Sequence, residues 1–261
     1  MFCPNCRYEY VDVVTRCPNC GVELVRELPA DTSARRYSYL KAATILSIIG
    51  ITYIFLLRNV ATITPELFRN TAMGQYSVIT MFLADLLILF FFIQFYREFA
   101  PRYNTRLKTG SIFGIIGALL LLPEYFIRMV RIFLIGNPFG SAFPIIAVDA
   151  VLPWISSILF LVFFTYLYME MYRAGHEKLK EASLWAVLGS AMSFLVLTYT
   201  LINYILLGGL AFMLIKVTNI SLLLLPFTAA GFAATIYFYI VFYRQLNLES
   251  TQDSKSLVYN R

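Results

Sequence analysis

Four cysteines near the start of the chain have the spacing of metal ligands. They form two Cys-Pro-Asn-Cys elements, one with Cys3 and Cys6 and one with Cys17 and Cys20, ten residues apart. Each tight turn directs two sulfurs to one point, and two turns supply the four tetrahedral thiolates of a structural zinc site. Because four thiolates leave no position for water, we expect one structural Zn²⁺ ion. Iron on the same thiolates, or no metal, remain alternatives. Gly21 suits the left-handed backbone that often follows such a turn.

Residues 2–25 resemble a minimal zinc ribbon, in which two CPxC knuckles flank a short β-hairpin. The resemblance covers about a tenth of the chain and departs from the usual pattern at Arg7, where a glycine is frequent. It implies folding that depends on the metal, since so small a module has almost no core. It also implies a surface that could recruit a protein partner. The rest of the chain resembles no family.

Three of the ionisable residues inside apolar segments are functional candidates, because charge is costly there and often functional. They are Asp85, Glu124 and Arg128. Arg128 follows Glu124 by one helical turn, so the two share a face and Asp85 can complete a cluster with them. The cluster is interpreted either as a neutralised structural pair near the interface or as a substrate or proton site in a cavity. The single histidine, His176, lies near a segment end, and no Ser/His/Asp set, P-loop or HExxH helix indicates an enzyme.

The elements that position these charges must cross a membrane. Hydrophobic residues make up 59% of the 261-residue chain and charged residues 14%, with a mean hydropathy of +0.71. Soluble domains are closer to about 45–50% apolar and about 25% charged. Six apolar segments are long enough to cross roughly 30 Å of hydrocarbon as helices. They are residues 40–57, 78–96, 111–135, 151–172, 184–207 and 220–243.

The predicted organisation is an all-α polytopic membrane protein with a small N-terminal β zinc ribbon. Residues 1–26 form the ribbon, 27–38 a linker, 39–245 the six-helix membrane domain and 246–261 a polar, disordered tail. Thirteen of the 21 Lys and Arg residues flank the spans on the side of the termini and five lie on the other side. The positive-inside bias therefore predicts cytoplasmic termini in a multi-pass protein of the cell membrane. The basic residues do not cluster on one soluble face, so no nucleic-acid partner is expected.

An internal repeat divides the membrane domain into three helical hairpins. The words LKAATILSIIG, LKTGSIFGIIG and LKEASLWAVLG begin at Leu40, Leu107 and Leu179, 67 and 72 residues apart. Lys and Gly keep a nine-residue separation in each word, and each even span closes with a Tyr-Arg pair. The small residues of the words are expected to form smooth faces for helix packing, with a cavity lining as the alternative.

Two functions follow as hypotheses. The first is a membrane-embedded scaffold or regulatory protein whose zinc ribbon recruits a partner. The second is a transporter or channel for a small solute or ion, with Asp85, Glu124 and Arg128 near the path. The spans are nearly pure apolar, which favours the scaffold. A polar cavity at the depth of Glu124 would reverse that order.

Overall fold

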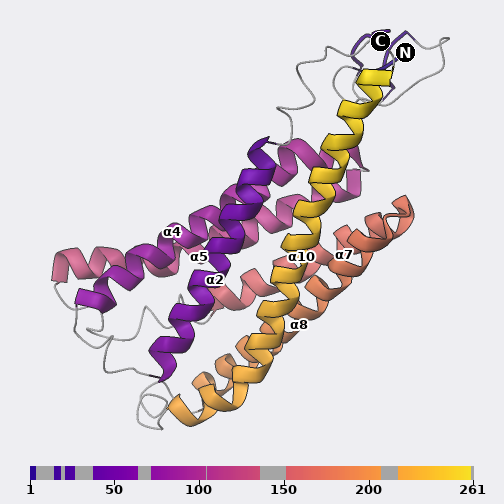
Figure 1. Cartoon of the computed structure of the whole chain (residues 1–261). Coiled ribbons are helices and arrows are strands. Elements are labelled where there is room, and N and C mark those ends of the chain that lie inside the picture. The colour runs from indigo at the N-terminus through magenta and orange to yellow at the C-terminus, as the bar shows by residue number, and fades with distance from the viewer. Residues whose placement is uncertain are drawn as a thin grey trace.

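The computed structural model describes residues 1–3, 15–18, 21–26, 38–63, 72–103, 105–135, 151–206 and 217–259. Six long α-helices occupy most of this part of the chain (Figure 1). They are α2 (Ser38–Ile63), α4 (Ala72–Gln94), α5 (Thr105–Ile135), α7 (Leu152–Ala174), α8 (Glu177–Leu206) and α10 (Val217–Tyr259). A π-helical turn, η1 (Phe95–Phe99), and a 3-10 turn, η2 (Ala100–Arg102), prolong α4. All six long helices are apolar enough to cross a membrane, which confirms a multi-pass membrane protein.

The helices are longer than the predicted spans, chiefly at the ends that carry charge. α5 begins at Thr105 and α8 at Glu177, each several residues before the apolar segment. Disorder was expected after Asn247, but α10 continues as a helix to Tyr259. Residues 244–259 contain neither glycine nor proline, and a helix keeps its backbone hydrogen bonds when it leaves the bilayer. Hydropathy marks where a helix is apolar and not where it ends.

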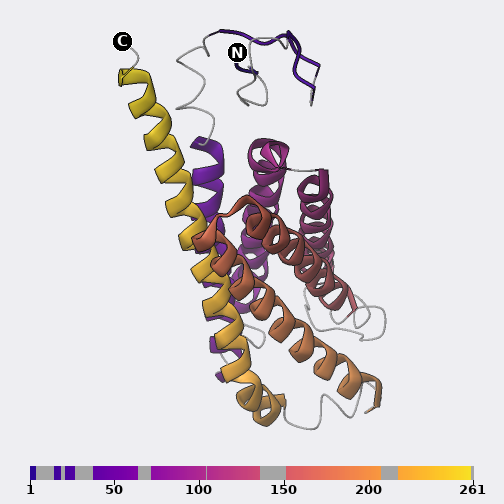
Figure 2. The same ribbon diagram turned by 90° about the vertical axis from the view of Figure 1, so that its right-hand side faces the viewer.

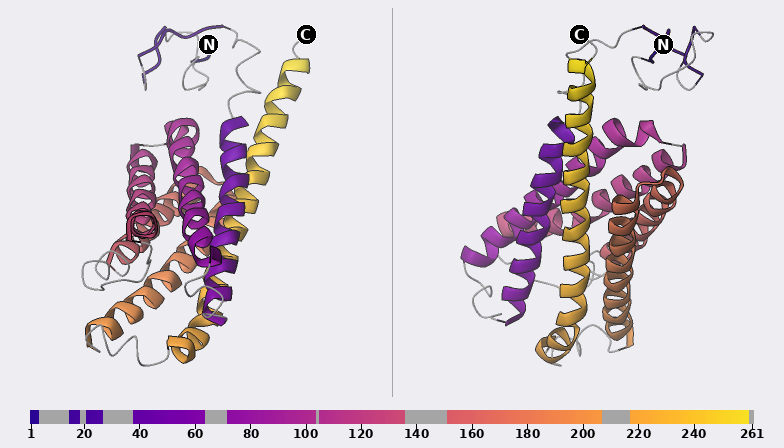
Figure 3. Two further views of the ribbon diagram at one scale, coloured as in Figure 1. Left: turned by 90° about the vertical axis from the view of Figure 1, so that its left-hand side faces the viewer. Right: turned by 45° about the vertical axis from the view of Figure 1, so that its right-hand side comes forward.

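The six helices form a closed ring in chain order. Each long helix packs against the next one in the sequence, and α10 packs against α2 to close the ring. Two short connections, one between η2 and α5 and one between α7 and α8, lie at the end of the ring where α2, α5 and α8 begin. We call this the near end, and the opposite end the far end. Both chain termini lie on the near-end side (Figures 1 and 3).

Among the described residues of α8, burial is greater toward the near end. On α8, Leu179, Ala182 and Ala186 are fully buried, whereas Val196 and Thr200 further along the helix are only partly buried. Figure 1 shows α8 and α10 diverging from α4 and α5 away from the termini, and Figure 2 shows α8 and α10 also diverging from each other in that direction.

The three repeated words make corresponding contacts in the three hairpins. Their leading residues, Leu40, Leu107 and Leu179, are all buried. Four residues after each leucine, a hydroxyl donates to that leucine's carbonyl oxygen at 2.6–2.7 Å, from Thr44, Ser111 and Ser183. The residue before each closing Tyr-Arg pair is also fully buried, at Phe95, Met171 and Phe242.

The final glycine of each word packs against the second helix of its own hairpin. A methyl group added at Gly50 would lie 3.1 Å from the Ala84 carbonyl oxygen, and one at Gly189 would lie 2.8 Å from that of Gly231. At Gly117 the nearest atom, 3.2 Å away, belongs to the Phe160 ring. The small residues therefore allow close helix packing, as expected from the repeat, and these three glycines do not line the cavity described below.

We expect Gly189→Ala to lower the thermal stability of the detergent-solubilised protein. Alanine has the higher helix propensity by about 1 kcal/mol, which alone would stabilise α8. The added methyl group must instead displace the Gly231 backbone, because 2.8 Å is too short for a carbon–oxygen contact, and overpacking of this kind costs about 1–3 kcal/mol. Thermal unfolding followed by intrinsic fluorescence measures the effect. Ser190→Ala, at the next position, adds no atoms and serves as the control; an equal or higher midpoint for Gly189→Ala would contradict the close packing.

Candidate functional site

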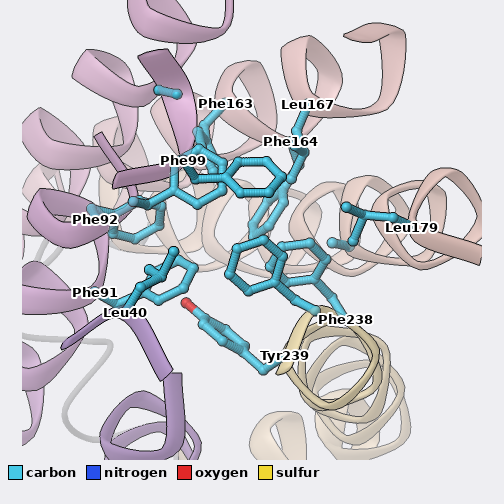
Figure 4. Packing of buried hydrophobic residues seen from close by; sticks show 14 of the residues in the cluster. Leu40, Phe91, Phe92, Phe99, Phe163, Phe164, Leu167, Leu179, Phe238 and Tyr239 are labelled. Carbon is cyan, nitrogen blue, oxygen red and sulfur yellow. The ribbon is translucent and has the colours of Figure 1, made fainter. Parts of the chain in front are cut away.

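Aromatic side chains fill the ring at the near end. Figure 4 shows rings from α4, α7 and α10 pointing toward a common centre. We call these buried residues the aromatic seal: Phe91, Phe92, Phe95, Phe99, Phe163, Phe164, Phe238, Tyr239 and Phe242. Three contacts with ring centroids 4.8–5.1 Å apart join α4, α7 and α10 in pairs: Phe91 with Tyr239, Phe92 with Phe163, and Phe164 with Phe238. The second helices of the three hairpins thus meet inside the ring.

The π-helical turn contributes to the seal. Phe95 and Phe99 lie at the two ends of η1, and both are fully buried. Their ring centroids are 4.9 Å apart, and each also contacts Phe242 of α10. Such wide turns occur frequently at functional sites. Here the turn places two rings of one helix beside one ring of another.

A cavity of about 440 Å³ lies between the aromatic seal and the far end. All six long helices contribute residues to its wall, and Phe92, Phe164 and Tyr239 belong to both the wall and the seal. Phe55 of α2 and Phe232 of α10 stack with ring centroids 4.1 Å apart at the contact that closes the ring. A volume of a few hundred Å³ is typical of small-molecule sites, which range over about 300–1,000 Å³.

The cavity wall combines aromatic rings with polar groups that mostly accept hydrogen bonds. Its polar residues are Asn59, Asp85, Ser156, Ser157, Ser190, Ser193, Thr200, Thr228, Thr235 and Tyr239. Several of the hydroxyls donate to backbone carbonyls, such as Thr235 to Gly231 at 2.9 Å and Ser156 to Gly117 at 2.8 Å. A hydroxyl whose proton is used in this way retains its lone pairs. These groups favour a ligand that donates hydrogen bonds.

The three predicted intramembrane charges have different positions. Asp85 is 3% exposed and lines the cavity. Glu124 is 6% exposed but is not part of the cavity wall; the wall residue nearest to it on α5 is Leu121. The backbone of Arg128 lies in α5, and its side chain is outside the described residues. The structure therefore assigns Asp85 to the cavity and does not test the predicted three-residue cluster.

Two of the four predicted metal ligands, Cys3 and Cys17, lie in the described part of the chain, and both are buried. Antiparallel bridges join Phe2 to Val25 and Arg16 to Glu23. Gly21 has a φ of +71° and donates its N–H to the Cys17 carbonyl oxygen at 2.8 Å, so the chain turns sharply after Cys17. Cys6 and Cys20 lie outside the described residues. Because most of the predicted ribbon lies outside the described residues, the ribbon and its metal stay predictions.

Sequence reasoning missed the cavity wall and the aromatic seal. Apart from Tyr239, the polar wall residues of α8 and α10 are serines and threonines, which helices tolerate in any environment because the hydroxyl can bond to its own backbone. The phenylalanines of the seal resemble those that face lipid. The internal repeat could have indicated the seal. Leu167 and Phe238 lie at the same sequence separation before their Tyr-Arg pairs as Phe91 does before its own.

The fold and the site define a class: a polytopic helical membrane protein with a ring of six helices around a central cavity, and with buried aromatic side chains between that cavity and the near end. Comparison with known proteins adds no family to this description. No protein-family model, curated protein or solved structure matches the chain.

Proposed function

We propose that the six-helix ring is a small-solute carrier that binds its substrate in the central cavity. The observation that carries the proposal is the cavity itself, which all six helices line and which the aromatic seal separates from the near end. A binding site near the middle of the membrane, accessible from one side at a time, is what alternating access requires. The cavity wall includes Leu121, one helical turn from Glu124, and a cavity at this depth supports a carrier over a scaffold.

The three-hairpin repeat supports a route for such a transition. The first helices of the hairpins pack through the small residues of their words, and the second helices meet in the aromatic seal. Rocking of one hairpin against the others would separate rings of α4, α7 and α10 while keeping each hairpin intact. The excess of Lys and Arg near the termini supports a cytoplasmic near end, which would place the cavity toward the outer side of the membrane.

We also propose that Cys3, Cys6, Cys17 and Cys20 hold one zinc ion in a structural site on the cytoplasmic side. The burial of Cys3 and Cys17 and the left-handed Gly21 support this assignment. A reducing compartment keeps thiols available for metal. Zinc binding would supply the free energy that folds the N-terminal module. Recruitment of a protein partner through this module is a separate hypothesis.

We expect a cysteine introduced at Thr228 to react with a membrane-impermeant thiol reagent added on the far side. Thr228 lines the cavity, so water should reach it there, and only a hydrated thiol ionises and reacts. Phe227→Cys is the matched control: this neighbouring residue is 53% exposed on the outside of the ring, where lipid would surround it. Mass spectrometry of sealed vesicles labelled with a methanethiosulfonate reagent measures the difference.

Labelling of Thr228→Cys from the near side alone, or equal labelling of both variants, would contradict the outward-facing cavity. The native cysteines are counted in the unsubstituted chain and subtracted. Phe238→Cys, in the seal, should remain unlabelled from either side because its position is fully buried.

A further inference from the structure

Two hydroxyl groups of the cavity wall differ from the others, and they indicate part of what the cavity binds if the proposed carrier function holds. The hydroxyls of Ser193, Thr228 and Thr235 each donate to a backbone carbonyl oxygen of their own helix. Within the described part of the chain, the hydroxyls of Ser190 and Tyr239 have no such acceptor. Each of these two groups therefore keeps a proton that a bound molecule can accept.

Both hydroxyls are buried, although they line the cavity. Ser190 is 7% exposed and Tyr239 is 1% exposed. Figure 4 shows Tyr239 extending from α10 toward Phe91 of α4, with its oxygen at the inner end of the side chain. A buried polar group without a partner costs free energy, and most such groups in folded proteins are satisfied by protein, water or a ligand. A ligand in the cavity that accepts these hydrogen bonds would remove that cost.

The two hydroxyls lie on neighbouring helices at the seal end of the cavity. Tyr239 belongs to the wall and to the aromatic seal, where its ring centroid is 4.8 Å from that of Phe91. Ser190 follows Gly189, and a methyl group added at Gly189 would lie 3.3 Å from the hydroxyl oxygen of Thr235. Thr235 precedes Tyr239 by one helical turn on α10. One polar group of a ligand can therefore meet both hydroxyls beside the seal.

Apolar side chains surround this end of the cavity. The rings of Phe92 and Phe160 stack with centroids 5.3 Å apart and an interplanar angle of 17°. Both rings line the cavity, together with Ile88 and Phe164. Such a wall suits an apolar or aromatic body, while a few placed polar groups fix the orientation of the ligand.

We propose that the cavity binds an organic solute with an apolar or aromatic body and a hydrogen-bond acceptor such as a carbonyl oxygen, which Ser190 and Tyr239 hold against the aromatic seal. The two hydroxyls donate to the acceptor oxygen, and the rings enclose the body. A donor group elsewhere on the solute would meet the lone pairs of hydroxyls such as that of Thr228. Recognition by Ser190 and Tyr239 uses neutral groups.

The test is competition against photolabelling of the purified full-length protein in lipid nanodiscs by benzophenone, an aromatic ketone that crosslinks on irradiation. Mass spectrometry locates the adducts, and we expect saturable labelling of peptides of the cavity wall. Fluorenone and fluorene, the competitors, have nearly the same shape, but only fluorenone carries a carbonyl oxygen. Fluorenone should compete about tenfold better, because two neutral hydrogen bonds separate them. Partition into protein-free nanodiscs corrects both concentrations.

Tyr239→Phe removes one oxygen and keeps the ring that contacts Phe91. This variant and Ser190→Ala should each reduce the preference for fluorenone about threefold, and the double variant should abolish it. Tyr237→Phe is the matched control: it makes the same change two residues away, at a position that is 40% exposed and outside the cavity wall, and should keep the preference. Tyr239→Phe should unfold at the same temperature or higher, because an unpartnered buried hydroxyl does not stabilise the fold.

Three results would overturn the proposal: no saturable adduct in the cavity wall, equal competition by fluorenone and fluorene, or a preference that survives in the double variant. An equal loss of preference in Tyr237→Phe and Tyr239→Phe would reject Tyr239 as the donor. Thermal unfolding of every variant verifies that it is folded. If the cysteine at Thr228 is labelled from the far side but fluorenone has no advantage over fluorene, the inference fails and the carrier proposal stands. If neither occurs, both fail.

Discussion

Phe242→Ala should open the near end of the ring and destabilise the protein by about 3–5 kcal/mol. Phe242 is fully buried, and its ring centroid lies 5.1–5.8 Å from those of Phe91, Phe95, Phe99 and Phe238. Removing this ring eliminates contacts with α4, η1 and α10 at once. Because lipid offers no hydrophobic driving force between helices, such packing contacts carry much of the stability of the ring.

The consequence for function is measurable in the Thr228→Cys background. With the seal intact, the thiol should be labelled from the far side only; with Phe242→Ala, it should also be labelled from the near side. Phe227→Ala removes the same ring from an exposed position of α10 and serves as the control for stability and for labelling. If Phe242→Ala fails to accumulate, Phe242→Leu, which keeps most of the volume, is expected to show a weaker opening. If a folded Phe242 variant were still labelled from the far side only, the barrier between the cavity and the near end would not depend on Phe242.

Cys17→Ser should remove the metal from the purified full-length chain. A protein isolated without chelators is expected to contain one zinc ion per chain, and the variant should lose it almost entirely, because a hydroxyl is a poor substitute for a thiolate ligand. Inductively coupled plasma mass spectrometry measures the zinc content and distinguishes zinc from iron. Arg16→Ala, which changes the exposed neighbour of the buried Cys17, should keep the full metal content.

The six helices of the membrane domain should remain folded in Cys17→Ser, since the metal module lies outside the ring. Thermal unfolding of the ring, read from the tryptophans Trp154 and Trp185 of α7 and α8, should therefore change little. A metal-free protein, or equal zinc in both cysteine and serine forms, would reject the four-thiolate site. One iron ion per chain would support the four-thiolate site but identify its metal as iron instead of zinc.

The sequence by itself determined the number and approximate position of the six helices. The length of an apolar segment is a local property, and a segment that crosses a bilayer must satisfy its backbone internally. The repeated words also indicated which residues hold equivalent places: the hydroxyls of Thr44, Ser111 and Ser183 make the same backbone bond. The extension of α10 to Tyr259 was missed because polar helices in water have no such signal.

Only the tertiary structure decided which face of each helix points inward. Phe227 and Phe238 are the same residue type on one helix, yet the first is 53% exposed and the second is fully buried. In a membrane protein both environments are apolar, so hydropathy does not separate them. The same ambiguity applied to Asp85 and Glu124, two buried carboxylates of which one lines the cavity. The closure of α10 onto α2 made the ring, and with it the cavity, because a contact between the first and last helices is set by packing and not by any local pattern.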